Sequence, residues 1–94
     1  MKYIIDLDGT LLDTKGGDYA GAKPINERLD RVRELYKEGH TIAIQTARGR
    51  HWEDYTLMQL DLFQIPYHAV SVGEKIHGDV YIDDKGINAK EFFV

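Results

Sequence analysis

The chain of 94 residues has no cysteine, only two prolines, and no long hydrophobic run. The lack of cysteine excludes disulfides and thiolate chemistry, and a small fold without disulfides suits a reducing compartment. The apolar runs are far shorter than the roughly 20 residues that a membrane span needs. The first residues, MKYIIDLDG, turn acidic too soon for a signal peptide. We therefore expect a cytoplasmic protein with no membrane partner.

Internal repeats, low-complexity segments and linkers are also lacking, which predicts a single domain over residues 1–94. A chain of this size hides only about 60–65% of its unfolded surface, so any insertion must be small. The net charge of −4 argues against non-specific nucleic-acid binding. A few basic residues in one cleft could still form a local site.

What the chain does contain is an alternation of short apolar runs with segments of helical periodicity. The strand candidates are residues 2–7, 41–46, 67–72 and 79–83. The helical segments are residues 24–38 and 50–63, and residues 87–93 add a short helix or strand. This order predicts an α/β fold, a three-layer Rossmann-like arrangement with a mostly parallel sheet and helices on both faces.

The helix limits follow from local signals. Pro24 suits a first helical turn, and Gly39 is typical of a helix end. In the second helix we expect Trp52, Tyr55 and Phe63 to face the core, because they recur at helical spacing.

Polar residues gather where the predicted strands end. Asp6 and Asp8 close the first strand, and Thr46 closes the second. Lys75 follows the third, and the pair Asp83-Asp84 closes the fourth. Because ligands of parallel α/β sheets bind beyond the carboxyl ends of the strands, these residues are the candidate site.

The four aspartates favour metal-assisted phosphoryl chemistry. Carboxylates brought to one sheet edge repel one another unless a cation lies among them, and hard oxygen ligands favour Mg²⁺ over zinc. An ionised aspartate can attack phosphorus, and Thr46 and Lys75 can bind the phosphoryl group. Backbone N–H groups after Asp6 are further phosphate donors, and Gly9 permits a close approach.

The segment DLDGT at 6–10, Thr46, Lys75 and the Asp83-Asp84 pair, in this order, resemble the four motifs of the haloacid dehalogenase (HAD) superfamily of phosphotransferases. Within it, TARG at 46–49, QL at 59–60, PYH at 66–68 and YIDDKG at 81–86 are similar to small phosphatases associated with capsule or polysaccharide biosynthesis.

The resemblance implies a role for each matching residue. Asp6 is the nucleophile and Asp8 the general acid/base, while Thr46 and Lys75 hold the phosphoryl group. The implied ligands of Mg²⁺ are the Asp6 side chain, the Asp8 carbonyl, and an acid of the last motif. We expect Asp83 to be the direct ligand, and Asp84 to bind directly or through water.

The same family sets its specificity with a cap, and here there is no room for one. Only about fifteen residues separate Gly9 from Pro24, enough for a flap over 9–23. We therefore expect a capless, open site, which either accepts a bulky phosphoester or is closed by a second subunit of a homo-oligomer.

Several other residues have two interpretations. Arg48 either binds a substrate phosphate or carboxylate, or pairs with a surface acid. Tyr19 could stack on a substrate, and His77 could touch one, although a surface position is the simpler reading. Lys85 could replace Lys75. We expect Asp13 to be a structural or solvated residue of the loop.

These observations predict a Mg²⁺-dependent phosphomonoesterase that acts on a small phosphoester, a sugar phosphate or another phosphorylated metabolite. One alternative is an enzyme resembling polynucleotide 3′-phosphatases, because an open site admits a strand. The other is a non-catalytic module that binds Mg²⁺ and phosphate.

Overall fold

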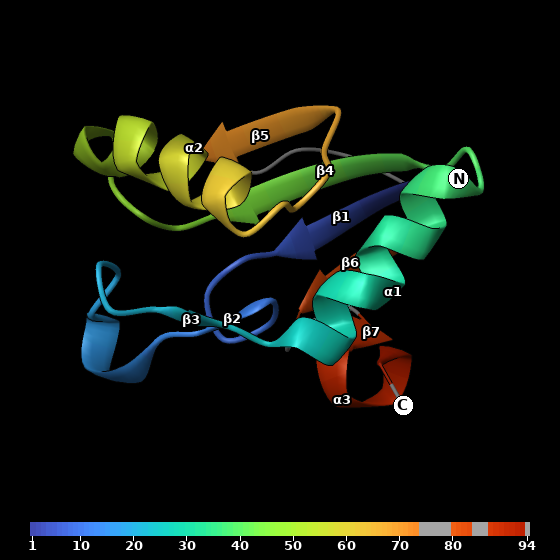
Figure 1. Cartoon of the computed structure of the whole chain (residues 1–94), viewed down its shortest axis with the longest axis horizontal. Coiled ribbons are helices and arrows are strands. Elements are labelled where there is room, and N and C mark those ends of the chain that lie inside the picture. Colours follow the sequence, from blue (N-terminus) through green and yellow to red (C-terminus); the bar gives the residue numbers. More distant parts are fainter. Residues whose placement is uncertain (74–79, 84–86, 94) are drawn as a thin grey trace.

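The computed structural model describes residues 1–73, 80–83 and 87–93, with the backbone alone at positions 81, 83 and 87–90. Parallel pairing joins five strands into one sheet in the order β5-β4-β1-β6-β7 (Figure 1). The strands are β1 (Lys2–Asp6), β4 (Thr41–Thr46), β5 (Ala69–Val72), β6 (Val80–Asp83) and β7 (Ile87–Asn88). The predicted α/β class with a parallel sheet is confirmed.

Strand β1 lies at the centre of the sheet and fixes where the strand ends meet. Ile5, which is fully buried, pairs with Ile44 of β4 on one side and with Ile82 of β6 on the other. One residue further along, Asp6 pairs with Gln45 of β4. The same step along β6 reaches Asp83, its last residue. The carboxyl ends of β1, β4 and β6 therefore meet at one edge.

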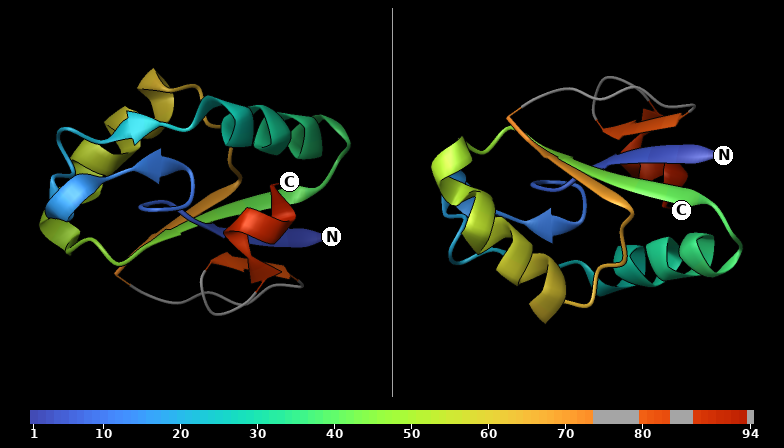
Figure 2. Two further views of the ribbon diagram at one scale, coloured as in Figure 1. Left: turned by 90° about the horizontal axis from the view of Figure 1, so that it is seen from below. Right: turned by 90° about the horizontal axis from the view of Figure 1, so that it is seen from above.

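The helices are α1 (Asn26–Lys37), α2 (Glu53–Leu62, preceded by the 3₁₀ turn η2, Arg50–Trp52) and α3 (Ala89–Phe92). Both views in Figure 2 place α1 and α2 on the same side of the sheet. Leu29 of α1 and Leu60 of α2 share one core cluster with Ile5. No helix in the described part of the chain is long and apolar enough to cross a membrane.

The position of the helices differs in one respect from the expected three layers. Phe92 of α3 packs on the same core cluster and lies 5.9 Å, between ring centroids, from Tyr3. In the described ranges, all three helices thus cover one face. For α1 and α2 the reason is the strand order, since β1, β4 and β5 follow one another in the same direction. Right-handed crossovers then place both connecting helices on the same face.

The flap predicted after β1 is a small hairpin with a 3₁₀ turn. It consists of β2 (Leu12–Asp13), η1 (Lys15–Gly17) and β3 (Lys23–Pro24), with β2 and β3 antiparallel. Pro24 pairs with Leu12 in this hairpin, and the Ile25 N–H donates to the Leu11 carbonyl at 2.9 Å. Helix α1 begins only at Asn26. The prediction that Pro24 lies in the first helical turn is wrong, because the chain there is still paired with the flap.

Helix α2 turns an unexpected face to the interior. Thr56, Gln59 and Leu60 are its buried residues. The predicted inward residues Trp52 and Tyr55 are only half-buried, and their rings meet edge to face with a centroid distance of 5.5 Å. Their assignment to the core is wrong, because the flap, not the sheet, is what they cover. The Tyr55 hydroxyl lies 3.5 Å from the Ala20 carbonyl of the flap.

Strand β5 begins later than the predicted residue 67. His68 precedes it, and its Nδ1 accepts a hydrogen bond from the Ile42 N–H of β4 at 3.0 Å. The His68 N–H in turn donates to the Ile42 carbonyl at 2.8 Å. A side chain thus replaces one rung of backbone pairing, and the regular strand starts at Ala69.

Candidate active site

The chain turns tightly after β1, around the carbonyl of Leu7. This oxygen accepts hydrogen bonds from the N–H groups of Leu11 at 2.9 Å and Leu12 at 3.0 Å. Gly9 has a φ of 80°, in the left-handed region that favours glycine. Its N–H donates to the Leu12 carbonyl at 2.8 Å. We expected backbone N–H groups here to face a phosphate, but that of Gly9 is used to close the turn.

Asp8 lies at the centre of a polar cluster that joins three segments. Its Oδ1 accepts from Thr14 Oγ1 of the flap at 2.7 Å and from Arg48 Nη2 at 2.8 Å. Its Oδ2 accepts from Arg48 Nε at 2.9 Å and from Thr46 Oγ1, at the end of β4, at 3.2 Å. The pair with Arg48 is therefore bidentate, which is the strongest geometry for this interaction.

The surroundings of Asp8 shift its pKa. Burial alone would raise it, but hydrogen bonds from Arg48, Thr14 and Thr46, together with the Arg48 charge, outweigh burial and lower the pKa from its ordinary 3.8. A carboxyl whose pKa is lower in the folded chain contributes stability above its unfolded pKa. That contribution is lost as the pH falls through the folded value.

We expect this linkage to appear in acid unfolding. The free energy of unfolding in urea, measured from about pH 5 down to about pH 2.5, should fall more steeply for the wild type than for Asp8→Asn, which has no carboxyl to protonate. The quantity to compare is the difference in free energy of unfolding between the two proteins at each pH, since the other carboxylates titrate equally in both. Parallel curves would show that the contacts of Asp8 do not favour its charged form.

Arg48 is fully buried and is held from both sides. Opposite Asp8, its Nη1 donates to Thr56 Oγ1 at 3.1 Å and to Gln59 Oε1 at 2.6 Å, both on α2. The Tyr19 ring of the flap lies over the guanidinium, 4.6 Å from Cζ to the centroid. Of the two interpretations of Arg48, this geometry favours pairing with an acid, but the acid is the predicted site residue Asp8 and not a surface acid.

Thr46 is also buried and is bonded within the cluster. Its hydroxyl donates to Asp8, as above, and accepts from the Arg48 N–H at 3.2 Å. A hydroxyl has one proton, so Thr46 must rotate to donate to a phosphate. To bind a phosphate as predicted, Thr46 must therefore exchange its hydrogen bond to Asp8 for one to a phosphate oxygen.

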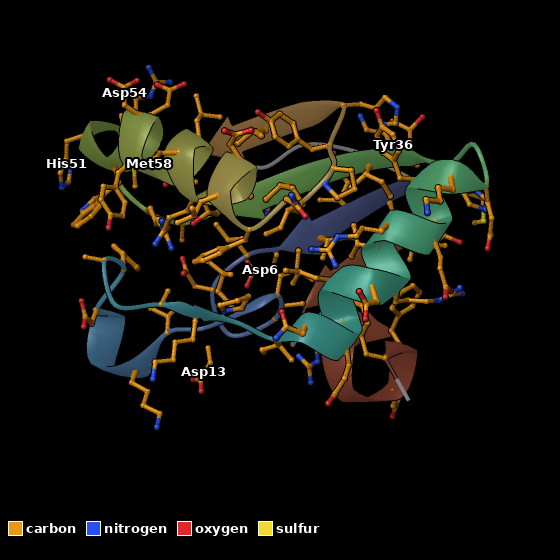
Figure 3. All side chains as sticks on the ribbon, in the orientation of Figure 1. Asp6, Asp13, Tyr36, His51, Asp54 and Met58 are labelled. Carbon is orange, nitrogen blue, oxygen red and sulfur yellow. The ribbon has the colours of Figure 1, made fainter. Side chains whose placement is uncertain are left out.

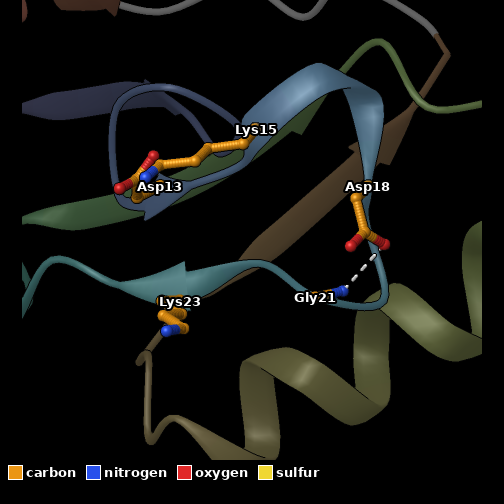
Figure 4. Close-up of a pocket in the computed structure, with 5 residues that line it drawn as sticks. All are labelled: Asp13, Lys15, Asp18, Gly21 and Lys23. Atoms are coloured by element: carbon orange, nitrogen blue, oxygen red, sulfur yellow. Dashed lines mark hydrogen bonds between the residues drawn. The ribbon is translucent and has the colours of Figure 1, made fainter.

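Asp6 and Asp13 lie in different surroundings. Asp6 is half-buried at the end of β1, near the middle of the view in Figure 3, whereas Asp13 lies on the outer side of the flap. Asp13 is exposed and lines a surface pocket with Lys15, Asp18, Gly21 and Lys23 (Figure 4). In the described part of the chain Asp13 is therefore apart from the candidate site.

The remaining predicted residues lie outside what the structure describes. These are Lys75, His77, Asp84 and Lys85, and for Asp83 only the backbone is described. Within the described residues there is no group of three or more acidic or histidine side chains that could hold a metal.

The chemistry of the residues at this edge nevertheless fits Mg²⁺. Strand register places Asp6 and the backbone of Asp83 on neighbouring strands, and both residues carry the hard oxygens that this ion prefers. The Asp8 carboxylate is occupied by Arg48, Thr46 and Thr14.

A family model of the haloacid dehalogenase-like hydrolases matches residues 3–93. The chain belongs to this family. No significant match is found among curated proteins.

Two solved structures resemble this HAD-like hydrolase. The crystal structure of a target protein from Vibrio cholerae is 31% identical, with a TM-score of 0.71, and the match covers 99% of this chain and 88% of that one. A chain from the structure of the Pnkp1/Rnl/Hen1 complex is 21% identical, with a TM-score of 0.69 over 79% of this chain and 28% of that one. The second similarity supports the fold alone. The HAD-like, capless α/β fold is thereby confirmed.

Thr14 and Thr56 were not predicted from the sequence, and Gln59 was part of the resemblance but had no predicted role. Thr14 follows a strand of only two residues, which periodicity does not detect. Thr56 and Gln59 are three residues apart and so share a helix face. That spacing was a usable signal, but a search for apolar faces passes over a polar one.

Proposed function

We propose that this HAD-like hydrolase is a Mg²⁺-dependent phosphomonoesterase that acts through an aspartyl-phosphate on Asp6. One observation carries the proposal. Asp8, two residues after Asp6 at the tip of β1, is hydrogen-bonded by Thr46 from the tip of β4. Residues of the first two motifs, distant in sequence, thus meet in a single cluster. Membership of the hydrolase family supports the same conclusion.

The chemistry divides into two displacements at phosphorus. In the first, a carboxylate oxygen of Asp6 attacks in line, and the bond to the leaving oxygen breaks with its electron pair. Asp8 supplies a proton to that oxygen. In the second, water attacks the aspartyl-phosphate, the bond to the Asp6 oxygen breaks, and Asp8 takes a proton from the water. Asp6 returns to its starting carboxylate.

The contacts of Asp8 suggest how it becomes available for this work. Each of the two carboxylate oxygens of Asp8 accepts two hydrogen bonds, so its roughly four lone-pair sites are all filled. The bond from Thr46 is the longest of the four at 3.2 Å. When Thr46 turns its hydroxyl to a phosphate oxygen, Oδ2 of Asp8 is freed to face the leaving oxygen. A phosphate beside Asp8 also raises its pKa, which favours the proton-donating form.

When bound, Mg²⁺ would neutralise phosphate charge and keep Asp6 ionised. The residues proposed to hold it are Asp6, the carbonyl of Asp8, and an acid at the end of β6, Asp83 or Asp84. Lys75 is proposed as a further cation for the phosphoryl group.

The proposed substrate is a sugar phosphate or another small phosphorylated metabolite. The short flap and the capless fold support a site that is open to solvent on the substrate side. The similarity to small phosphatases of capsule or polysaccharide biosynthesis supports a sugar phosphate. An open site could also be covered by a second subunit.

The test is hydrolysis of p-nitrophenyl phosphate by the wild type with Mg²⁺, after EDTA, and after Mg²⁺ is added back. We expect turnover with Mg²⁺, loss of at least about a hundredfold with EDTA, and full recovery on addition. A panel of sugar phosphates and a 3′-phosphorylated oligonucleotide then separates the substrate classes. Faster release from the oligonucleotide would favour the polynucleotide alternative, and no hydrolysis of any compound would favour the binding module.

A further inference from the structure

Two polar side chains of α2 are buried although the proposed chemistry gives them no task. Thr56 is 0% exposed and Gln59 is 2% exposed. Both accept a hydrogen bond from Nη1 of Arg48. Burial of a polar group costs free energy unless its hydrogen bonds are made, so the reason for each residue must lie in what it contacts.

Gln59 makes a second contact that Thr56 does not. Its Nε2 donates to the backbone carbonyl of Tyr19, in the flap, at 2.7 Å. The orientation of the amide is unambiguous. Arginine can only donate and a carbonyl can only accept, so the Gln59 oxygen must face Arg48 and its nitrogen must face the flap. Among the described residues, no hydrogen bond joins Thr56 to the flap.

The flap touches the Asp8–Arg48 pair at two further points. Thr14 donates to Asp8 at 2.7 Å, and the Tyr19 ring covers the Arg48 guanidinium. The contacts therefore form a closed ring, from Asp8 through Arg48 and Gln59 to Tyr19, and back along the flap to Thr14. In such a ring the flap and the carboxylate cannot move independently.

We propose that Gln59 is a positioning residue, which docks the flap on α2 and, through Arg48, fixes the orientation of the Asp8 carboxylate. The kinetic part of this proposal rests on the phosphatase function proposed above. The docking of the flap does not, and it can be observed without turnover.

Two variants separate the contacts of Gln59. Gln59→Glu keeps an acceptor for Arg48, now a charged one, but places a carboxylate against the Tyr19 carbonyl, so the flap contact is lost. Thr56→Val removes a hydrogen bond to the same Arg48 nitrogen and leaves the flap contact intact. Trp52 is the only tryptophan in the chain and its ring lies 5.2 Å from that of Tyr19. Its fluorescence therefore reports whether the flap is docked.

We expect Gln59→Glu to move Trp52 emission to longer wavelength, because Tyr19 no longer covers the indole, while Thr56→Val retains the wild-type emission. With p-nitrophenyl phosphate and Mg²⁺, Gln59→Glu should lower kcat about tenfold or more through misplacement of Asp8. The KM should change less than kcat. Thr56→Val should change kcat by less than about threefold.

Several results would overturn the proposal. If both variants alter emission and kcat equally, Gln59 only supports Arg48. If Gln59→Glu changes emission but leaves kcat at the wild-type value, the link to Asp8 is wrong. If Gln59→Glu fails to fold, Gln59→Met, which also lacks the flap contact, must show the same red shift. If the wild type hydrolyses no phosphoester, the proposed function fails, but the emission of the variants still decides whether Gln59 docks the flap.

Discussion

Replacement of Asp6 by asparagine should lower kcat for p-nitrophenyl phosphate by at least about a thousandfold. Asparagine has nearly the same shape as aspartate but no anionic oxygen that can form the acyl phosphate, so the first displacement has no nucleophile. Loss of the negative charge also weakens one proposed ligand of Mg²⁺, because a neutral amide oxygen replaces a carboxylate. Both effects slow the first displacement, and we expect no decrease in KM that would offset the loss of kcat.

Asp13→Asn is the matched control. It is the same substitution, seven residues later, at an exposed carboxylate on the outer side of the flap. We expect it to keep wild-type activity. Circular dichroism should show that both variants remain folded. If Asp6→Asn kept more than a tenth of the wild-type rate, Asp6 would not be the nucleophile, and a carboxylate that merely positions water would have to be considered.

The sequence was most informative where one local pattern decides the structure. Strand β4 has its predicted limits, because TIAIQT is β-branched and apolar between two clear stops. The spacing of Leu29, Val32 and Leu35 in α1 is that of an amphipathic helix, and all three are buried. Asp6 and Thr46 were placed correctly at strand ends, since parallel strands bring their carboxyl ends to one edge.

The errors arise where a tertiary contact overrides the local pattern. Trp52 and Tyr55 have helical spacing, but they pack on the flap, whose position no periodicity reveals. Gln59 looks like a surface residue, and it is buried because Arg48, eleven residues away, needs acceptors. The orientation of Arg48 is itself set by Asp8, forty residues away. Such polar clusters form only when the fold is complete.

The second large effect is expected for Arg48→Met, which should lower the free energy of unfolding by about 3 kcal/mol or more. The guanidinium is fully buried, and the Asp8 carboxylate beside it is 22% exposed. Removal of one member of such a pair leaves the other charge poorly solvated. Thr56 and Gln59 also lose their buried donor. Urea unfolding followed by circular dichroism measures the change.

Arg31→Met is the control for Arg48→Met. Arg31 pairs with Glu34 at 3.3 Å, and both side chains are exposed, at 43% and 64%. Such a pair contributes less than about 1 kcal/mol. The comparison also decides between the two interpretations of Arg48. A residue that reaches out to bind substrate would, when replaced, raise KM with little loss of stability. A residue that holds Asp8 would lower stability and kcat together, and the double variant Asp8→Asn/Arg48→Met would be less destabilised than the sum of the two single changes, because neither partner is left alone.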